Sequence, residues 1–374
     1  MATISDRESC EEATLIPSIP NDIAVNILAR VPLGCHPILA SVSKSFYSVV
    51  YSQHLYYARS LLGYVQPFLH LCIRVSSPNH SLRWYAVHYI PGGSPKAIPL
   101  PPVPDSMVGS AYASIGPRIY VIGGSTDDAP SQIVRCLDCR LQVWELVPNM
   151  RVAREFAAAE VVDGKLYVIG GCVADSWTRS RNWAEVYDPA TNRWDPVDSD
   201  HNDEDFVRAK WMHASAEAGG KMYAMADRNG VVYEPRTKRW AVVRGELDSG
   251  WRGRACAIGG ILYCYDYLGK IRGFDLHSCS SSWKKVRGLE EVLPRFLCGA
   301  TLTNLGNNLV AIWEAECATG VEIWGAEIQL NQIKDNGSSD ESEEESIWGT
   351  VLWCSVILVV PTKSTILHSL AVTL

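Results

Sequence analysis

The chain has 374 residues, 47% of them hydrophobic, with thirteen tryptophans and sixteen tyrosines, which suits a sizeable core and more than one small domain. Its net charge of −7 comes largely from one acidic run, Asp335 to Glu345, so the composition excludes the basic footprint of a nucleic-acid-binding protein. The twelve cysteines are scattered from Cys10 to Cys354, which indicates a reducing compartment, the cytoplasm or the nucleus.

No secretory leader and no membrane span is predicted. Residues 1–14 are polar and acidic and lack both a basic start and an apolar core, so we expect a disordered N-terminus. The longest apolar run, Ile347 to Val360, has 14 residues and ends at Pro361. A membrane-spanning helix takes about 20 residues. We therefore expect buried strands in this run and no membrane partner.

Residues 15–60 show the spacing of short amphipathic helices. Two sets of apolar residues each fall on one face of a helix: Ile23, Ile27, Leu28 and Val31, then Leu39, Val42, Phe46, Val49 and Val50. A bundle this small has little core of its own. Part of these faces therefore needs a cover, either from the rest of the chain or from another protein.

Residues 66–374 change to short β runs divided by turn residues, and the pattern repeats. Ala157 to Gly171 reads as a strand, an Asp163-Gly164 hairpin turn and a second strand. Equivalent tyrosines lie 47, 56 and 40 residues apart, at 120, 167, 223 and 263, and equivalent tryptophans 50, 46 and 43 apart, at 144, 194, 240 and 283. A fifth copy runs from Gly299 to Trp324. Four strands per repeat of this length predict the blades of a β-propeller.

The ends of this region each lack partners. Residues 68–75 and 82–90 look like strands without an inner neighbour, and Leu367 to Val372 looks like a strand without a blade. Because open sheet edges invite aggregation, we predict that the C-terminal strand completes the blade begun at residue 68, which gives six blades. The acidic segment 334–346 is expected to be a solvated, disordered loop inside the last blade.

Two motifs carry a family resemblance. Ile19-Pro20-Asn21-Asp22-Ile23, followed by Ile27 to Pro32 and Val42-Ser43-Lys44-Ser45-Phe46, resembles the F-box. Tyr167-Val168-Ile169-Gly170-Gly171, with Tyr187 and Trp194, resembles the kelch repeat. Their order resembles the plant F-box/kelch-repeat proteins, and implies a mainly β fold: a six-bladed kelch-type propeller preceded by a small α-helical F-box.

The chain departs from these patterns at four places. Ser43 and Phe46 stand where the F-box commonly has Cys and Trp, which leaves adaptor binding expected. The third and fourth repeats lack the glycine pair after the tyrosine strand and have Ala226-Asp227 and Tyr265-Asp266 instead. We expect those blades to form with altered loops.

The resemblance implies the substrate-recognition subunit of a Skp–cullin–F-box ubiquitin ligase. The F-box would dock on the Skp adaptor and, through it, on a cullin, while the propeller holds a target protein whose identity the sequence does not give. A separate enzyme supplies ubiquitin, so this chain needs no catalytic residue and no cofactor. The residues implied in adaptor binding are Pro20, Ile23, Ile27, Leu28, Val31, Pro32, Leu39, Val42, Lys44, Phe46 and Val49.

Loop lengths predict which face of the propeller binds the target. Turns on one face are tight, whereas the loops and blade crossings on the other, such as 172–182, 196–212 and 244–254, are long. Function tends to lie on long loops held by a rigid scaffold. The long loops combine arginines with aromatic residues, a pairing typical of binding hot spots and suited to an acidic or phosphorylated peptide. The predicted target-binding residues are Arg154, Trp177, Arg179, Arg181, Arg208, Trp211, Trp251, Arg252, Arg295 and Phe296. In the alternative interpretation, the arginines tie one blade to the next by bonding carbonyls and the tryptophans pack between blades.

Two rival functions stay open. Some kelch propellers are metal-dependent enzymes, but the only close cysteine pair, Cys136 and Cys139, has no second pair or histidines at zinc-binding spacing. The nine histidines form no ligand pair on one strand or helix, so we expect no metal site. The second rival is a propeller scaffold that binds partners without ubiquitination, and co-purification with Skp and cullin distinguishes it from the ligase subunit.

Overall fold

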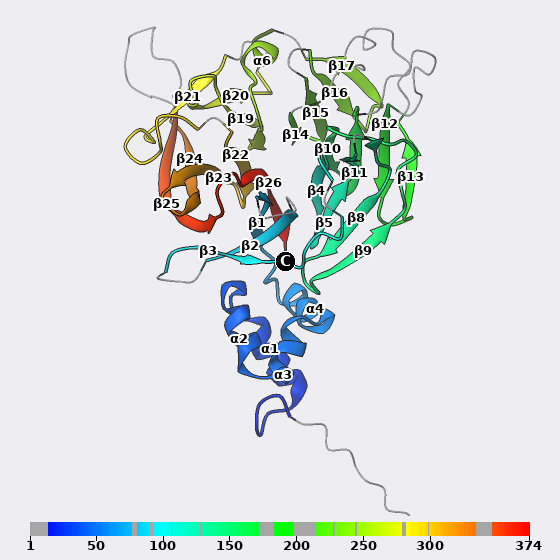
Figure 1. The fold of residues 1–374 in the computed structure, drawn as a ribbon, viewed down its shortest axis with the longest axis vertical. Helices are drawn as coiled ribbons and strands as arrows, with labels where there is room; N and C mark the ends of the chain where they lie inside the picture. The colour runs from blue at the N-terminus through cyan, green and yellow to red at the C-terminus, as the bar shows by residue number, and fades with distance from the viewer. Residues whose placement is uncertain are drawn as a thin grey trace, which may run out of the picture. The chain divides into compact units, whose positions relative to one another are not determined.

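A computed structural model of the chain describes residues 14–76, 81–89, 93–105, 107–127, 129–171, 183–197, 212, 214–226, 229–243, 245–278, 282–297, 299–333 and 346–374. The chain forms two compact units, Met1–Val65 and Gln66–Leu374 (Figure 1). The first is helical and the second is built of β-sheets, so the predicted mainly β fold with N-terminal helices is confirmed. Of the segments expected to be disordered, residues 1–13 and 334–345 lie outside the described residues.

The helical unit contains α1 (Asn21–Ala29), a short 3-10 helix η1 (Leu33–Cys35), α2 (His36–Val42), α3 (Lys44–Val50) and α4 (Gln53–Leu61). Its small core includes Val25, Leu28 and Ala29 of α1 and Leu55 of α4. The buried Arg59 of α4 donates to the carbonyls of Ala29 and Val31 at 2.8 and 2.7 Å, which satisfies acceptors at the end of α1.

None of the described helices is by itself long and apolar enough to span a membrane. The segments Asn21–Ala29 and Leu33–Val42 reach the required length and composition only together, and they are bent by 113° at the break between them.

In the residues that the structure describes, the β unit contains four sheets of four antiparallel strands each. The first sheet, in the order β26-β1-β2-β3, has β26 (Thr365–Thr373), β1 (Pro67–Val75), β2 (Ser81–His88) and β3 (Lys96–Pro99). The second has β4 (Ala111–Ile115), β5 (Arg118–Ile122), β8 (Val134–Asp138) and β9 (Val143–Val147), with β6 (Ser125–Thr126) and β7 (Ala129–Pro130) as a small side ribbon. The third has β10 (Ala158–Val162), β11 (Lys165–Ile169), β12 (Ala184–Asp188) and β13 (Arg193–Pro196). The fourth has β14 (Ala214–Ala218), β15 (Lys221–Met225), β16 (Val231–Glu234) and β17 (Arg239–Val242).

A fifth sheet has eight strands and consists of two sets of four. One set is β18 (Cys256–Ile258), β19 (Ile261–Tyr265), β20 (Ile271–Asp275) and β21 (Lys284–Arg287), and a short helix α6 (Gly245–Gly250) precedes it. The other is β22 (Thr301–Leu305), β23 (Asn308–Cys317), β24 (Gly320–Ile333) and β25 (Ser346–Val360). A short parallel pairing of β21 with β25 joins them, Val286 opposite Ile347. We treat each set of four strands as one blade and number the blades 1 to 6 from the sheet that contains β1.

The C-terminal strand closes the ring, as predicted. β26 pairs antiparallel with β1, with Phe68 opposite Val372 and Leu71 opposite Ser369 (Figure 1). The innermost strands, β26, β4, β10, β14, β18 and β22, each contact the next one around the ring, and β22 contacts β26 again. The last strand of the chain thus supplies the inner edge of the first blade. Each inner strand therefore has a neighbouring inner strand on either side.

Three of the repeated tryptophans tie their blades to the segment before. The indole N–H of Trp144 in β9 donates to the carbonyl of Pro101 at 3.0 Å, and that of Trp194 in β13 donates to Pro148 at 2.8 Å. Trp283, just before β21, donates to Glu246 at 2.7 Å. Each acceptor lies after the outer strand of the preceding blade. The near-regular spacing of these tryptophans therefore reflects one inter-blade bond that the second, third and fifth blades share.

The glycine pair of the third blade allows a close backbone approach. Gly171 has φ +69°, and a Cβ there would lie 2.4 Å from the carbonyl oxygen of Glu155. The fifth blade lacks this pair and makes its turn with a carboxylate instead. Buried Asp266 accepts the backbone N–H groups of Leu268 and Lys270 at 2.8 and 2.9 Å and the side chain of Arg272 at 2.7 Å. The altered loop expected there is thus an Asp-centred turn.

The strand predicted for Ile347 to Val360 is present, but it is buried only in part, at residues such as Ile347, Ile357 and Val360. The segment forms one long strand, β25, in which Trp348, Leu352 and Val359 are exposed. The continuous apolar run resembles a strand covered on both faces, but β25 pairs with β24 along its length and with β21 only at its start.

Cys136 and Cys139 of the close cysteine pair are both buried free thiols, and burial raises the pKa of Cys136 to about 12.

Candidate functional site

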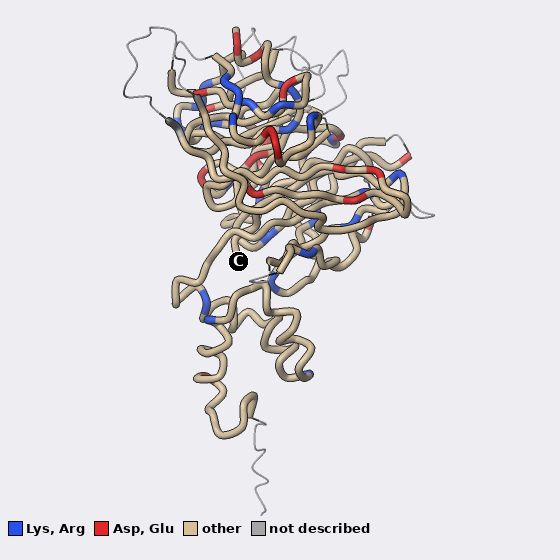
Figure 2. The backbone as a smooth tube through the Cα atoms, turned by 90° about the vertical axis from the view of Figure 1, so that its left-hand side faces the viewer, with Lys and Arg blue, Asp and Glu red and all other residues tan. Residues whose placement is uncertain are grey.

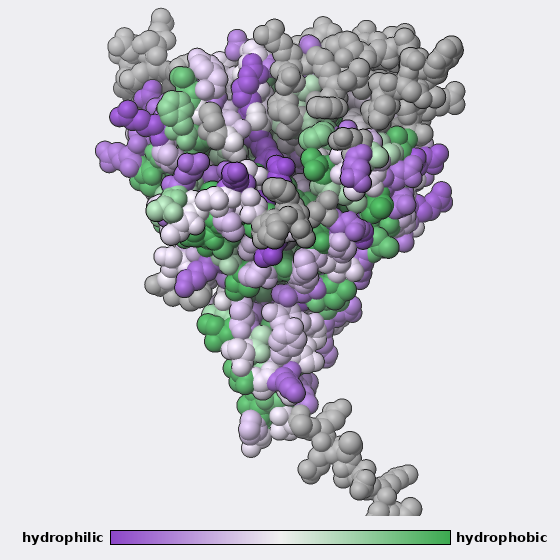
Figure 3. Space-filling view, viewed as in Figure 1, coloured by the Kyte–Doolittle hydropathy of each residue, from purple (hydrophilic) through white to green (hydrophobic). Residues whose placement is uncertain are grey.

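The helical unit has an exposed apolar surface. Ile23 and Ile27 project from the side of α1 that faces away from the core, and Ile27 is 45% exposed. Val42, the last residue of α2, is 62% exposed. Figure 3 shows hydrophobic side chains at the surface of this unit. Exposed apolar surface of this kind marks an interaction site.

Charge is sparse on the same unit. Between Thr14 and Val65 the only Asp, Glu, Lys or Arg residues are Asp22, Arg30, Lys44 and Arg59 (Figure 2). Arg59 is buried and bound to backbone carbonyls. With so few charges to desolvate, an apolar partner surface would cover these helices at low electrostatic cost.

The predicted adaptor-binding residues divide into surface and core. The exposed ones are Pro20, Ile23, Ile27, Pro32, Val42 and Lys44. Leu28 is buried, Val31 is half-buried, and Leu39, Phe46 and Val49 are half-buried against the core. Ile38 and Tyr47, which the prediction did not include, are also exposed, on α2 and α3. Once the buried residues of α1 are known, Leu28 lies on the core side of the helix and Ile27 on the exposed side. The apolar spacing alone places both residues on the same face.

Arg154, predicted to bind the target, connects two blades instead. Its backbone N–H donates to Ser131 at 3.0 Å, and its carbonyl accepts from Gly124 at 2.8 Å, both in the second blade. Its side chain donates to the carbonyls of Gly170 and Trp183 at 2.7 and 2.8 Å, in the third blade. The side chain is buried, so the alternative interpretation, an arginine that ties blades by bonding carbonyls, describes this residue.

Trp251 and Arg252 also serve the fold. Trp251 is fully buried, and its indole N–H donates to the carbonyl of Gly253 at 3.0 Å. Arg252 donates to its neighbour's carbonyl, that of Trp251, at 2.8 Å, and to Asp248 in α6 at 3.4 Å. The burial of Trp251, like that of Arg154, corrects the prediction of a direct target contact. Both sit on crossings where long side chains fill the space between blades.

Arg295 and Phe296, also predicted, are exposed on the crossing between the fifth and sixth blades, and Phe296 is 66% exposed. The turn between β19 and β20 lies against this crossing, since Leu297 donates to the carbonyl of Gly269 at 3.2 Å. That turn exposes Tyr267 (76% exposed) and Leu268, which sequence reasoning missed. The remaining predicted residues, Trp177, Arg179, Arg181, Arg208 and Trp211, lie outside the described residues.

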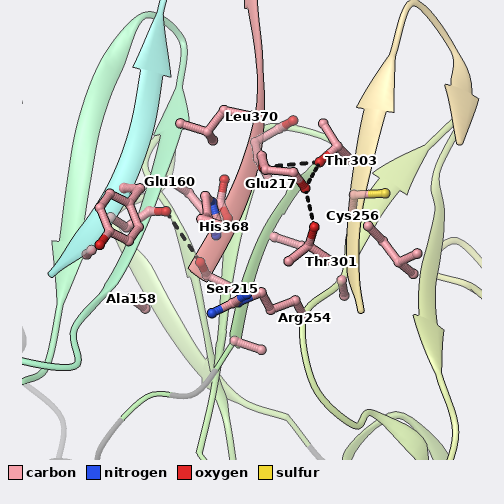
Figure 4. A pocket seen from close by; sticks show the side chains of 18 of the residues that line it. Ala158, Glu160, Ser215, Glu217, Arg254, Cys256, Thr301, Thr303, His368 and Leu370 are labelled. Carbon is pink, nitrogen blue, oxygen red and sulfur yellow. Dashed lines mark hydrogen bonds between the residues drawn. The ribbon is translucent and has the colours of Figure 1, made fainter. Parts of the chain in front are cut away.

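The innermost strands enclose a channel cavity of about 510 Å³. Glu160, Arg254 and His368 are among the side chains that line it (Figure 4). Burial raises the pKa of Glu160 to about 7, and the neighbouring charge of Glu217 acts in the same direction. Burial and the charge of Arg254 lower the pKa of His368 to about 3, and its ring stacks on Tyr112 with centroids 5.5 Å apart. Ser369 donates to Thr301 at 2.7 Å.

One end of the channel, on the long-loop face, opens into a second pocket of about 520 Å³. The residue two positions before the start of each innermost strand is equivalent from blade to blade, and four of these six residues line the pocket. We call these six residues the mouth ring: Lys363, Gly109, Phe156, Met212, Arg254 and Gly299, in blade order from the first to the sixth. Lys363, Gly109, Phe156 and Arg254 line this pocket together with Arg74 of β1.

Among the residues that the structure describes, no group of three or more His, Cys, Asp and Glu side chains is placed to hold a metal ion.

The comparisons with known proteins match both units. The family model described as "F-box domain" matches residues 16–57, and that described as "FKB95, Kelch-repeats domain" matches residues 84–358. An Arabidopsis thaliana F-box/kelch-repeat protein, At4g39550, is 31% identical over 97% of this chain and 95% of its own length. A second, At4g39590, is 32% identical over 93% of this chain and 88% of its own. The solved structure titled "Structure of YjhT" aligns with a TM-score of 0.49 at 14% identity, covering 76% of this chain and 97% of that one. The chain therefore belongs to the plant F-box/kelch-repeat family.

Proposed function

We propose that this chain is the substrate-recognition subunit of a Skp–cullin–F-box ubiquitin ligase, working in the cytoplasm or nucleus. The observation that carries the proposal is the surface of the helical unit. Ile23, Ile27 and Val42 expose apolar area on a unit that has only four charged residues between Thr14 and Val65. The Skp adaptor that F-box domains bind in general is the partner that would cover this surface.

The division of labour requires no catalytic group in this chain. The helical unit docks on the adaptor, the adaptor connects to a cullin, and the propeller holds the target. Tethering raises the effective concentration of the target's lysines near the ubiquitin-carrying enzyme, which accelerates transfer without a new chemical step.

The long-loop face of the propeller is the proposed target surface. It carries exposed Phe296 and Tyr267, which lie on two backbone segments in direct contact, and it contains the mouth of the channel. Exposed aromatic side chains on rigid loops are enriched among the residues that dominate binding energy.

The test compares cells that express the wild-type chain with cells that express the variant Ile27→Asp. Proteins that co-purify with the propeller are identified, and their abundance is measured in both lines. For a ligase subunit, the target proteins become more abundant in the variant line, because they are captured but not ubiquitinated. Unchanged abundance and unchanged ubiquitination of every captured protein contradict the proposal and favour the non-ubiquitin scaffold.

A further inference from the structure

The mouth ring is divided into a cationic side and an apolar side. In blade order, Arg254 and Lys363 lie on either side of Gly299, which carries no side chain. Phe156 and Met212, also neighbours in the ring, lie on the other side. The six equivalent positions of the mouth ring thus carry different side chains. A ligand with one charged and one apolar group would therefore bind in one orientation.

A third cation joins the same side. Arg74 lies near the end of β1, opposite Thr365 of β26, two residues after Lys363. Burial raises the pKa of Tyr112, and the charges of Arg254 and Arg74 both act against that shift, so both guanidinium groups lie within electrostatic reach of one hydroxyl. Arg74, Arg254 and Lys363 therefore surround a single pocket.

These cations have no acidic counterpart in the pocket. None of the residues that line the pocket is Asp or Glu. In the part of the chain that the structure describes, none of the three cations forms a salt bridge. Burial lowers the pKa of Arg254. Glu314, a carboxylate that acts on Arg254 from a distance, instead accepts the backbone N–H of Ile366 at 2.5 Å. Arg254 is therefore partly desolvated, and none of the three cations has a carboxylate in the pocket, which favours an anion from outside.

The opposite side of the pocket is apolar and shaped by the backbone. Phe156 and Val108 are exposed, and Met107 and Leu82 line the wall behind them. Gly109 has φ +69°, and a Cβ there would lie 2.9 Å from the Phe156 ring, so the glycine lets the ring lie against the main chain. A volume of about 520 Å³ accommodates one or two side chains, which is small for a nucleic acid on a chain of net charge −7.

We propose that the mouth of the channel binds an acidic segment of the target protein, with a carboxylate or phosphate held by Arg74, Arg254 and Lys363 and a neighbouring apolar side chain held against Phe156. This assignment rests on the proposed function, because it gives the chemistry by which the propeller recognises its target. Arginine presents a planar fork that binds either anion through two parallel hydrogen bonds.

The test measures binding of fluorescent peptide pools to the full-length chain. Each pool has degenerate flanking positions and one fixed central residue, which is glutamate, phosphoserine or glutamine, and binding is followed by fluorescence anisotropy. The glutamate or the phosphoserine pool binds at least about tenfold more tightly than the glutamine pool, since hydrogen bonds to charged groups exceed neutral ones by roughly that factor. The tighter of the two acidic pools identifies the anion.

Three variants test the pocket, and a fourth is a matched control. Arg74→Gln, Arg254→Gln and Lys363→Gln each weaken the acidic pool about tenfold and leave the glutamine pool unchanged. The control, Arg236→Gln, removes an equal charge from the exposed turn between β16 and β17, on the tight-turn face, and has no effect. If Arg254→Gln lowers the melting temperature, Lys363→Gln decides, because Lys363 is exposed in a surface turn.

Two results overturn the proposal: acidic pools that bind no more tightly than the glutamine pool, and an Arg236 variant that weakens binding as much as the pocket variants. Adaptor pull-down with the pocket variants keeps this result separate from the proposed function. Retained adaptor binding with no acidic-peptide binding removes the pocket proposal alone. If the wild-type chain does not bind the adaptor, the proposed ligase function is contradicted, even where the pocket binds acidic peptides.

Discussion

Arg154 and Glu185 form an ion pair of 2.8 Å in which neither side chain is more than 1% exposed. The carboxylate also accepts the backbone N–H groups of Arg151 and Val152 at 2.7 and 3.2 Å. Because the backbone of Arg154 bonds the second blade and its side chain bonds the third, this pair fixes the two blades to each other. An arginine beside an aromatic residue on a long loop can therefore be a structural connection between blades.

The first prediction concerns that pair. Arg154→Met leaves the carboxylate of Glu185 buried without its cation, which costs about 3–5 kcal/mol of unfolding free energy. The control Arg236→Met breaks an exposed pair with Asp163, 3.5 Å apart, and costs less than about 1 kcal/mol. Urea unfolding of both variants measures the difference. Equal, small losses would show that the buried pair does not connect the blades energetically.

The second prediction concerns the glycine pair of the third blade. Gly171→Ala adds the cost of a left-handed backbone, about 1–2 kcal/mol, to that of a Cβ placed 2.4 Å from the Glu155 oxygen, about 1–3 kcal/mol more. Gly164→Ala is matched in backbone, with φ +74° and nothing within 4 Å, and carries only the first cost. Denaturant titration should separate the two variants. Equal destabilisation would mean that the backbone at Glu155 shifts away from the added Cβ at no cost in free energy.

The third prediction uses Glu160 in the channel. Its pKa rises from 4.5 to about 7 on folding, so the native state binds its proton more tightly than the unfolded state does. That stabilisation is present below about pH 4.5 and is lost as the pH rises through 7. The loss amounts to roughly 1–3 kcal/mol, after allowance for water in the channel.

Glu160→Gln should therefore gain unfolding free energy over the wild type between pH 5 and pH 8, while the two differ little in slope below pH 4.5. Burial lowers the pKa of His70 to about 4 and, with the charge of Arg254, that of His368 to about 3, so these groups destabilise the fold as the pH falls. Both are present in wild type and variant, and they largely cancel in the difference. A difference that does not change with pH would contradict the shifted carboxyl group.

The fourth prediction separates core from surface in α1. Leu28→Ala empties part of the small core and costs about 2–5 kcal/mol, whereas Ile27→Ala removes exposed surface and changes stability by about 0.5 kcal/mol or less. Hydrogen exchange of the α1 and α4 amides in the full chain reports the stability of this unit. Equal protection in the two variants would contradict the assignment of these neighbours to opposite faces.

The repeat in the sequence was sufficient to predict the propeller. Tyr120, Tyr167, Tyr223 and Tyr263 all lie on the second strand of their blades, and the strand from Thr365 pairs where an inner strand was missing. Turn glycines and alternating apolar residues depend on neighbouring positions only, so they can be recognised in the sequence. The long strand β25 was misjudged because an apolar run does not show how many neighbours cover it.

The binding site was less predictable. Arg154 and Phe156 are two residues apart, yet the first is buried between blades and the second lines the mouth of the channel. A shift of two residues in the start of β10 would exchange these two positions, and sequence patterns place strand ends only to within a few residues. Lys363, Arg254 and Gly299 form one side of the mouth ring only when six strand starts, far apart in the chain, are aligned in space.

The most direct test of the central claim is a pull-down of the Skp adaptor by the full-length chain in three forms: wild type, Ile27→Asp and Leu61→Asp. Both variants place one aspartate on an exposed apolar position of the helical unit, on α1 and on α4 respectively. The account predicts that the wild type and Leu61→Asp retain the adaptor and that Ile27→Asp loses it, with all three propellers folded. Adaptor binding by Ile27→Asp at the wild-type level would contradict the claim that the exposed face of α1 is the docking surface.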